Sequence, residues 1–182
     1  RGIPVISTNT RGIAIEIYRI GDRSLTDTVG TYNYARGDFQ RSLGRYEVEQ
    51  LRQSRGIAVW KGELAVESPP LNADVTTAFP VDQAVGELKA GVYIMVAQPR
   101  ETKNLDNNFD SLATQWFIVS DLGLTAVSGN DGIHVFVNSL ATTEAKNDAE
   151  VRLVSRANEV LATRRSDPGG HVLFEPGLAS GE

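Results

Sequence analysis

Alternation of apolar and polar residues is the main pattern in this chain, and it predicts β-strands along most of its length. Residues 12–20 place Ile13, Ile15 and Ile17 on one face and Ala14, Glu16 and Tyr18 on the other. A period of two over this length is typical of a strand with one buried face. Residues 91–97 are an apolar run of strand length. The first half of the chain is therefore predicted to contain a β-sheet.

The stretch 116–140 reads as two strands joined by a tight polar turn at 128–132. Further short strands and turns follow at a spacing of roughly 8–12 residues, which indicates a β-sandwich. The predicted strands of this half are 115–120, 125–126, 133–140, 149–156, 159–165 and 171–174. Asn130-Asp131-Gly132 is predicted to form a hairpin turn that needs a positive φ angle.

One helix is predicted, over residues 38–55. Asp38 is suited to the N-cap position and Gly56 to the C-cap position. Leu43, Tyr46 and Leu51 provide the apolar surface of this helix.

Two segments interrupt the strands. Gly62 lies between two short predicted strands, 57–61 and 63–67, and indicates a hairpin or a bulge. The segment 99–110 is polar and rich in Asn and Asp, which predicts a domain boundary. The chain is thus predicted to be two tandem β-sandwich domains, 1–110 and 111–182, with the helix inserted in the first. The second has about five or six strands, fewer than a full sandwich, and is expected to be truncated.

Composition excludes several classes of function. Of 182 residues, 41% are hydrophobic, and the formal net charge is -5. This balance argues against nucleic acid and anionic membrane surfaces as partners, because both attract clustered Lys and Arg. No apolar run reaches the ~18 residues of a membrane span. The chain has no cysteine, so it has no disulfide, thiolate nucleophile or thiolate metal site.

The residues that could carry metal chemistry are few. His134 and His171 are the two histidines, and each falls in a predicted strand. A metal site needs several ligands that converge, which favours the interpretation that both are structural. The segment 106–110 has oxygen ligands for calcium but lacks the spacing of a calcium loop, so a linker is favoured.

The residues that could carry catalysis or recognition are also weak candidates. Strand carboxylates could converge as a glycosidase pair, but any β-protein offers such pairs. Ser120-Asp121 and Ser128 have no nucleophile-elbow motif and no convincing base. Trp60 and Trp116 could stack on sugars, although packing is the commoner role of a strand tryptophan. The sequence Arg36-Gly37-Asp38 is short enough to occur by chance. The strand carboxylates are Glu16, Glu63 and Glu67. We therefore assign no catalytic, cofactor-binding or metal-ligating residue and predict no cofactor.

Taken together, the segments of this chain resemble the macroglobulin-like domains of bacterial α2-macroglobulins, which are large periplasmic proteins that trap proteases. The most specific phrases are Trp116-Phe-Ile-Val-Ser-Asp-Leu-Gly-Leu124 and Asp131-Gly-Ile-His-Val-Phe-Val-Asn-Ser-Leu140. Their order and spacing carry the resemblance, which covers nearly the whole chain. The other segments are 15–23, 59–64, 76–81, 88–93, 151–163 and 167–178.

The resemblance implies a tandem of fibronectin-type, immunoglobulin-like sandwiches that act as a non-catalytic scaffold. The implied partners are neighbouring domains of a longer parent chain and, through that parent, target proteases. The implied location is the periplasm or cell envelope. The family's thioester motif needs a cysteine and cannot lie in this chain, and no segment reads as a protease-sensitive bait. Two alternatives stay open: a cell-surface β-sandwich adhesion module, and an accessory β-domain of a secreted hydrolase.

Overall fold

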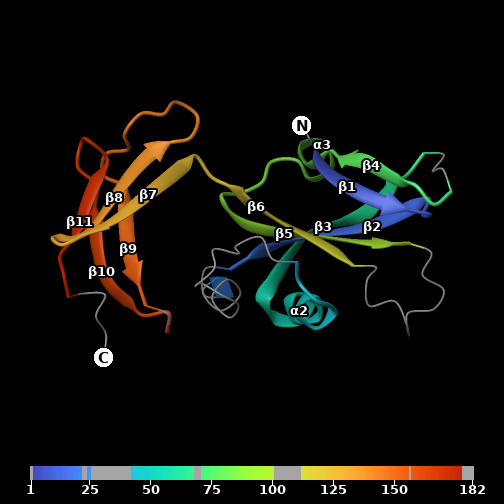
Figure 1. Cartoon of the computed structure of the whole chain (residues 1–182), viewed down its shortest axis with the longest axis horizontal. Helices are drawn as coiled ribbons and strands as arrows, with labels where there is room; N and C mark the ends of the chain where they lie inside the picture. Colours follow the sequence, from blue (N-terminus) through green and yellow to red (C-terminus); the bar gives the residue numbers. More distant parts are fainter. Residues whose placement is uncertain are drawn as a thin grey trace. The chain divides into compact units, whose positions relative to one another are not determined.

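A computed structural model describes residues 2–21, 24–25, 42–67, 71–100, 112–155 and 157–177. The chain divides into two compact units, Arg1–Val119 and Ser120–Glu182. Both are built mainly of antiparallel strands (Figure 1). The predicted all-β class with tandem sandwiches and one helical insertion is confirmed.

The first unit contains two packed sheets. The larger sheet has the order β3-β2-β5-β6 and the smaller pairs β1 with β4. Figure 1 shows the β1–β4 pair on one side of the larger sheet and helix α2 on the other. A short helix, α3 (Val81–Val85), follows β4. The strands are β1 (Ile3–Thr8), β2 (Gly12–Ile20), β3 (Gly56–Ala65), β4 (Asp74–Phe79), β5 (Gly91–Pro99) and β6 (Ala113–Val119).

The core between the two sheets follows the predicted alternation. Ile13, Ile15 and Ile17 of β2 point into it, and Phe79 of β4 closes it from the smaller sheet. Residues 93, 95 and 97 of the neighbouring strand β5 belong to the same core. Burial of these apolar side chains is the main stabilising contribution to this unit.

Strand β2 is buried on its second face as well, which differs from the half-exposed strand predicted. Tyr18 and Ile20 belong to a separate core cluster with Ile94, Val96 and Trp116. Helix α2 and the helical turn after it cover this part of the sheet (Figure 1). The alternation identified the strand, but only the tertiary position of the helix decides that both faces are covered.

The helix begins later than predicted. Helix α2 spans Arg45–Gln50 and continues as the π-helix η2, Leu51–Arg55. Asp38 lies outside the described residues, but residues 42–44 are not helical, so a start at Asp38 is wrong. The N-cap is Gly44, whose N–H donates to the Glu47 carboxylate at 2.7 Å. The side chain that satisfies this helix end therefore lies inside the helix rather than before it.

The apolar face of the helix also differs from the prediction. Leu43 and Leu51 are buried as expected, but Tyr46 is 74% exposed. Val48, three residues before Leu51, takes the inward position. At the other end, Gly56 is the C-cap as predicted, but its backbone is extended rather than left-handed and it begins β3.

Strand β3 runs continuously through Gly62, so a hairpin there is wrong. A register shift does occur in this pairing, between Ile17 and Tyr18, where Val59 is the extra residue on β3. Gly62 has a packing role instead. A Cβ atom at this position would lie 2.4 Å from the Trp60 indole. The glycine leaves room for that ring, which packs on Phe79 with ring centroids 5.1 Å apart.

The second unit has a three-stranded sheet, β11-β8-β7, and a two-stranded sheet, β10-β9 (Figure 1). The predicted hairpin is confirmed: Gly129 pairs with Gly132 across residues 130–131, and Gly132 has φ +134°. The strands are β7 (Leu122–Gly129), β8 (Gly132–Ser139), β9 (Glu150–Val154), β10 (Val160–Arg165) and β11 (His171–Phe174). The buried core consists of Val135, Val137, Val151, Val172 and Phe174.

Strand β7 adds no residue to this buried core. Leu124 is on the same face as Val137, its partner across the ladder, yet it is 62% exposed. Leu122 is also exposed. Strand β7 is an edge strand of its sheet and contains no charged residue and no proline.

The boundary predicted at Asp110 falls among residues 101–111, outside the described part. Strand β6, which that boundary places in the second module, pairs with β5 in the sheet of the first unit. Its Trp116 is buried with Tyr18 and Ile94 of that unit. The two compact units accordingly divide between Val119 and Ser120.

Candidate functional site

A charged cluster ties the π-helix to the larger sheet of the first unit. Glu16 of β2 accepts hydrogen bonds from the Tyr18 hydroxyl at 2.5 Å and from Arg52 Nε at 2.9 Å. Lys61 of β3 lies opposite Glu16, with its Nζ 3.5 Å from the carboxylate. The cluster therefore joins β2, β3 and η2 through one carboxylate.

The pKa of Glu16 argues against a role as a catalytic acid. Partial burial raises the pKa of this carboxyl, but hydrogen bonds from Tyr18 and Arg52 and the charges of Arg52 and Lys61 outweigh burial and lower it below its ordinary value. A glycosidase acid needs a raised pKa. The nearby Glu63 pairs with Arg100 at 2.9 Å, and Glu67 is exposed beyond the end of β3. In the described contacts, Glu16 and Glu63 therefore lie beside cations, and Glu67 faces solvent. None of the three lies beside a second carboxylate as a glycosidase pair would.

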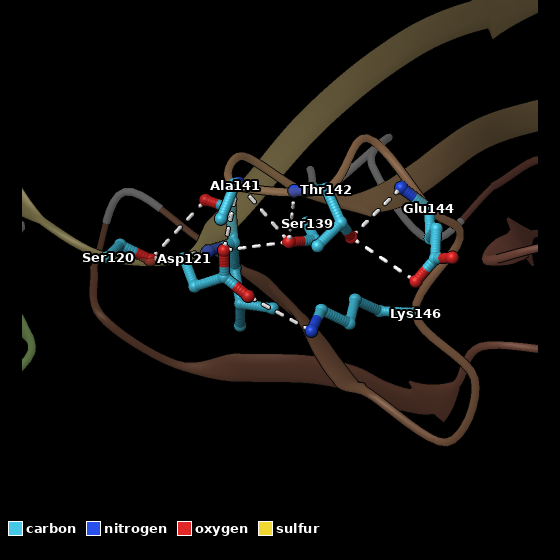
Figure 2. A network of polar contacts seen from close by, with 8 residues as sticks. Ser120, Asp121, Ser139, Ala141, Thr142, Glu144 and Lys146 are labelled. Carbon is cyan, nitrogen blue, oxygen red and sulfur yellow. Dashed lines mark hydrogen bonds and ion pairs between the residues drawn. The ribbon is translucent and has the colours of Figure 1, made fainter.

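A polar network at the start of β7 holds the loop after β8 (Figure 2). Asp121 Oδ1 accepts from the Ser139 hydroxyl at 2.8 Å and from the Ala141 N–H at 3.1 Å. Lys146 Nζ lies 3.0 Å from the other carboxylate oxygen. The Ser139 hydroxyl, on a residue only 2% exposed, accepts from the amides of Ala141 and Thr142. The donor and both acceptor positions of this hydroxyl are thus occupied.

This network was not predicted from the sequence, and it is structural. Ser120, which the sequence does not support as a hydrolase nucleophile, accepts from the Leu122 N–H at 2.9 Å, which shapes the turn into β7. Ser139 carries a local signal that could have found it. Ser139 ends β8, and a serine at a strand end commonly caps the following turn by accepting from amides two and three residues on, as it does here. The partner Asp121 is eighteen positions away in the sequence and has no local signal.

The pH dependence of stability should report on Asp121. The hydrogen bond and charge of Lys146, the Ser139 hydroxyl and the Ala141 amide lower the pKa of this carboxyl from 3.8 to about 2. A lowered folded-state pKa stabilises the fold above the unfolded value, and the contribution is lost as pH falls from there through about 2. We expect Asp121→Asn to remove this part of the pH dependence, measured by urea unfolding from about pH 5 to about pH 2.

The matched variant for this experiment is Lys146→Met. It removes the ion pair but keeps the bonds from Ser139 and Ala141, so the pKa of Asp121 is lowered less. The loss of stability on acidification should therefore be smaller than in the parent chain and be complete at a higher pH. Parallel pH curves for the parent chain and Asp121→Asn would contradict the assignment.

The two histidines meet on the outer face of the three-stranded sheet. His134 Nδ1 lies 2.9 Å from His171 Nε2, and His134 Nε2 lies 3.1 Å from Asp131 Oδ2. His134 alternates with the buried Val135, so its ring lies on the face turned away from the core. Sequence reasoning did not place the two histidines together.

The remaining candidates fall in two groups. Trp116 is buried and Trp60 is partly buried against the core, so neither offers an open face for stacking on a sugar. The segments 36–38 and 106–110 lie outside the described residues.

Within the described ranges, no group of three or more His, Cys, Asp or Glu side chains could hold a metal ion. The helices described in these ranges include none with the length and apolar character of a membrane span.

The chain consists of two β-sandwich units, and its polar clusters hold strands and turns together. These features define a modular all-β protein. The sequence matches two family models. The first, described as the bacterial α2-macroglobulin MG2 domain, covers residues 1–111, and the second, described as the MG3 domain, covers residues 119–182. The chain belongs to the bacterial α2-macroglobulin family, as the resemblance predicted.

Individual relatives agree with this assignment. The α2-macroglobulin of Escherichia coli is 24% identical over 174 residues, which is 96% of this chain and 10% of the relative. The α2-macroglobulin of Xylella fastidiosa is 24% identical over 183 residues, or 100% of this chain and 11% of that protein. The chain thus spans about a tenth of the length of these relatives.

Solved structures show the same fold. A crystal structure of native E. coli α2-macroglobulin spanning domains NIE-MG1 aligns with a TM-score of 0.69 at 23% identity, over 96% of this chain and 78% of that one. The trypsin-activated E. coli protein aligns with a TM-score of 0.67 at 23% identity, over 96% of this chain and 11% of that one.

Proposed function

We propose that this chain is a non-catalytic scaffold segment of a bacterial α2-macroglobulin that traps and inhibits proteases in the periplasm or cell envelope. Family membership supports the proposal, because the matched relatives are long chains of which this segment is a small part. In that setting its direct partners are neighbouring domains, and target proteases are reached only through the whole protein.

The observation that carries the proposal is that polar side chains in this chain connect elements of the fold. Glu16 joins two strands to a helix, and Asp121 with Ser139 holds a loop. Hydrogen bonds of this kind fix the geometry of a module, whereas a catalytic group must be free to meet a substrate. The role supported is to hold a defined shape between neighbours.

The test compares the chain alone with the longer protein that contains it. We expect the purified 182-residue chain, in molar excess over trypsin, to leave cleavage of a protein substrate unchanged. Trypsin is a suitable probe, because one relative was solved in a trypsin-activated form. The longer protein should reduce that cleavage under the same conditions.

A paired substitution in the longer protein then tests the scaffold role. Ile15→Ala removes buried surface from the first unit, and Ile6→Ala makes the same chemical change at an exposed position. Only the first should weaken the inhibition. Inhibition of trypsin by the 182-residue chain itself, or equal effects of the two substitutions, would contradict the proposal.

A further inference from the structure

The only two histidines of the chain lie side by side, although they are 37 positions apart. His134 is on β8 and pairs with Leu173, while His171 on the neighbouring β11 pairs with Phe136. This diagonal arrangement puts both imidazoles on one face of the sheet. Their ring centroids are 5.2 Å apart and their planes differ by 18°. The two nitrogens face each other at hydrogen-bond distance, and at least one of the rings must accept.

Neighbouring side chains orient each ring. His134 Nε2 donates to the Asp131 carboxylate, so the Nδ1 lone pair of His134 is directed toward His171. This hydrogen bond also lowers the pKa of Asp131 and keeps the carboxylate ionised. The His171 ring lies against Phe136, with centroids 4.9 Å apart. Each imidazole is therefore held by a neighbouring side chain.

We propose that His134 Nδ1 and His171 Nε2 form a binding site for a divalent transition-metal ion. Imidazole nitrogens bind such ions at about 2.0–2.1 Å, so two ligands at the right angle of tetragonal Cu²⁺ or Ni²⁺ are about 2.9 Å apart, and at the tetrahedral angle of Zn²⁺ about 3.3 Å apart. The two nitrogens are already 2.9 Å apart. Both rings have to turn, because nitrogens 2.9 Å apart on rings with centroids 5.2 Å apart place the two lone pairs nearly along one line.

The Asp131 contact has the form of the outer shell of known metal sites. A metal-binding histidine commonly donates its other ring N–H to a carboxylate, which fixes the tautomer and makes the ligand nitrogen more basic. Asp131 stands in this relation to His134. The described residues provide no third protein ligand, so water completes the coordination. Imidazole ligands favour Cu²⁺, Ni²⁺ and Zn²⁺ over Mg²⁺ and Ca²⁺.

The protons balance without another reactant. Both rings bind as neutral ligands, and each donates one nitrogen lone pair to the ion. The proton now shared between the rings moves through water to His171 Nδ1, so a neutral pair releases no net proton. When either ring is protonated, that proton leaves to solvent on binding.

The charged groups near the pair favour a cation. Asp131 faces His134, and Asp167 lies beside His171, where its carboxylate accepts from the His171 backbone N–H at 2.9 Å. The neighbours of His134 across the ladders are the apolar Val127 on β7 and Leu173 on β11.

The experiment is a titration of the untagged 182-residue chain with Zn²⁺ alone, followed by NMR of the imidazole protons. A tag rich in histidine would obscure the result, whereas the chain itself gives only two sets of imidazole signals. We expect both sets to shift together and to saturate at one ion per chain, and Mg²⁺ to have no effect. Shifts in neither set, or in only one, would overturn the proposal.

Calorimetry of variants with Zn²⁺ tests the individual roles. His134→Gln and His171→Gln should each weaken binding by about tenfold or more, and Asp131→Asn by about tenfold, as is usual for an outer-shell carboxylate. Asp148→Asn is the matched control, because it removes the same charge from a residue paired with Arg165. Binding by the double histidine variant as tight as that of the parent chain would overturn the proposal, as would equal effects of Asp131→Asn and Asp148→Asn. If a variant fails to fold, the NMR titration of the parent chain decides.

Discussion

Replacing Ile15 with alanine should lower the free energy of unfolding by about 2–5 kcal/mol, because truncating a fully buried isoleucine loses transfer free energy and leaves a cavity. Ile15 is 0% exposed at the centre of β2, between the two sheets of the first unit. Both tryptophans belong to this unit, so tryptophan fluorescence during urea unfolding follows it selectively.

Ile6→Ala is the control for that measurement. It makes the same change in the same unit, at a strand position that is 66% exposed. We expect a change within about 0.5 kcal/mol, as is usual for surface positions. Equal losses from the two variants would mean that the region between the sheets is not the core of this unit.

The second large effect is expected for Gly132→Ala in the second unit. Gly132 has φ +134°, and a Cβ atom there would lie 2.2 Å from the Phe174 carbonyl oxygen. Backbone strain at such a position costs about 1–3 kcal/mol. The clash adds to this strain, because it moves β11 away from β8 and disturbs the buried Phe174. Far-UV circular dichroism should show a loss of strand structure at lower urea than in the parent chain.

Gly177→Ala separates the two causes. Gly177 also has a positive φ, +94°, but no atom lies within 4 Å of its added Cβ. It therefore tests backbone strain without the clash. A Gly132→Ala effect no larger than that of Gly177→Ala would show that the close approach of Phe174 is unimportant.

The strands could be predicted from the sequence because their alternation is a local property. Residues 12–20 and 132–139 carry their own signal, and the structure forms strands at both. The helix start was missed for a physical reason. Asp38 has the chemistry of an N-cap, but the cap is made by Glu47, a side chain that reaches back from inside the helix to Gly44. Sequence pattern does not distinguish these two solutions.

Glycine was the other source of error. The sequence pattern predicts a hairpin or a bulge at Gly62, because glycine is common in both features. Its missing side chain instead leaves space for the Trp60 ring, two residues earlier on the same strand. The polar sites were missed because their members are distant in the sequence. Asp121 and Ser139, like His134 and His171, are brought together only by the pairing of strands.

The exposed leucines of β7 affect how mutational tolerance should be understood. Leu124→Asp costs little where the side chain meets water, as it does here. In any longer protein in which a neighbour covers that face, the same change buries a charge and costs far more. An uncharged edge strand is also an open template for another strand. Tolerance profiles of the isolated segment and of such a longer protein would therefore diverge first along β7.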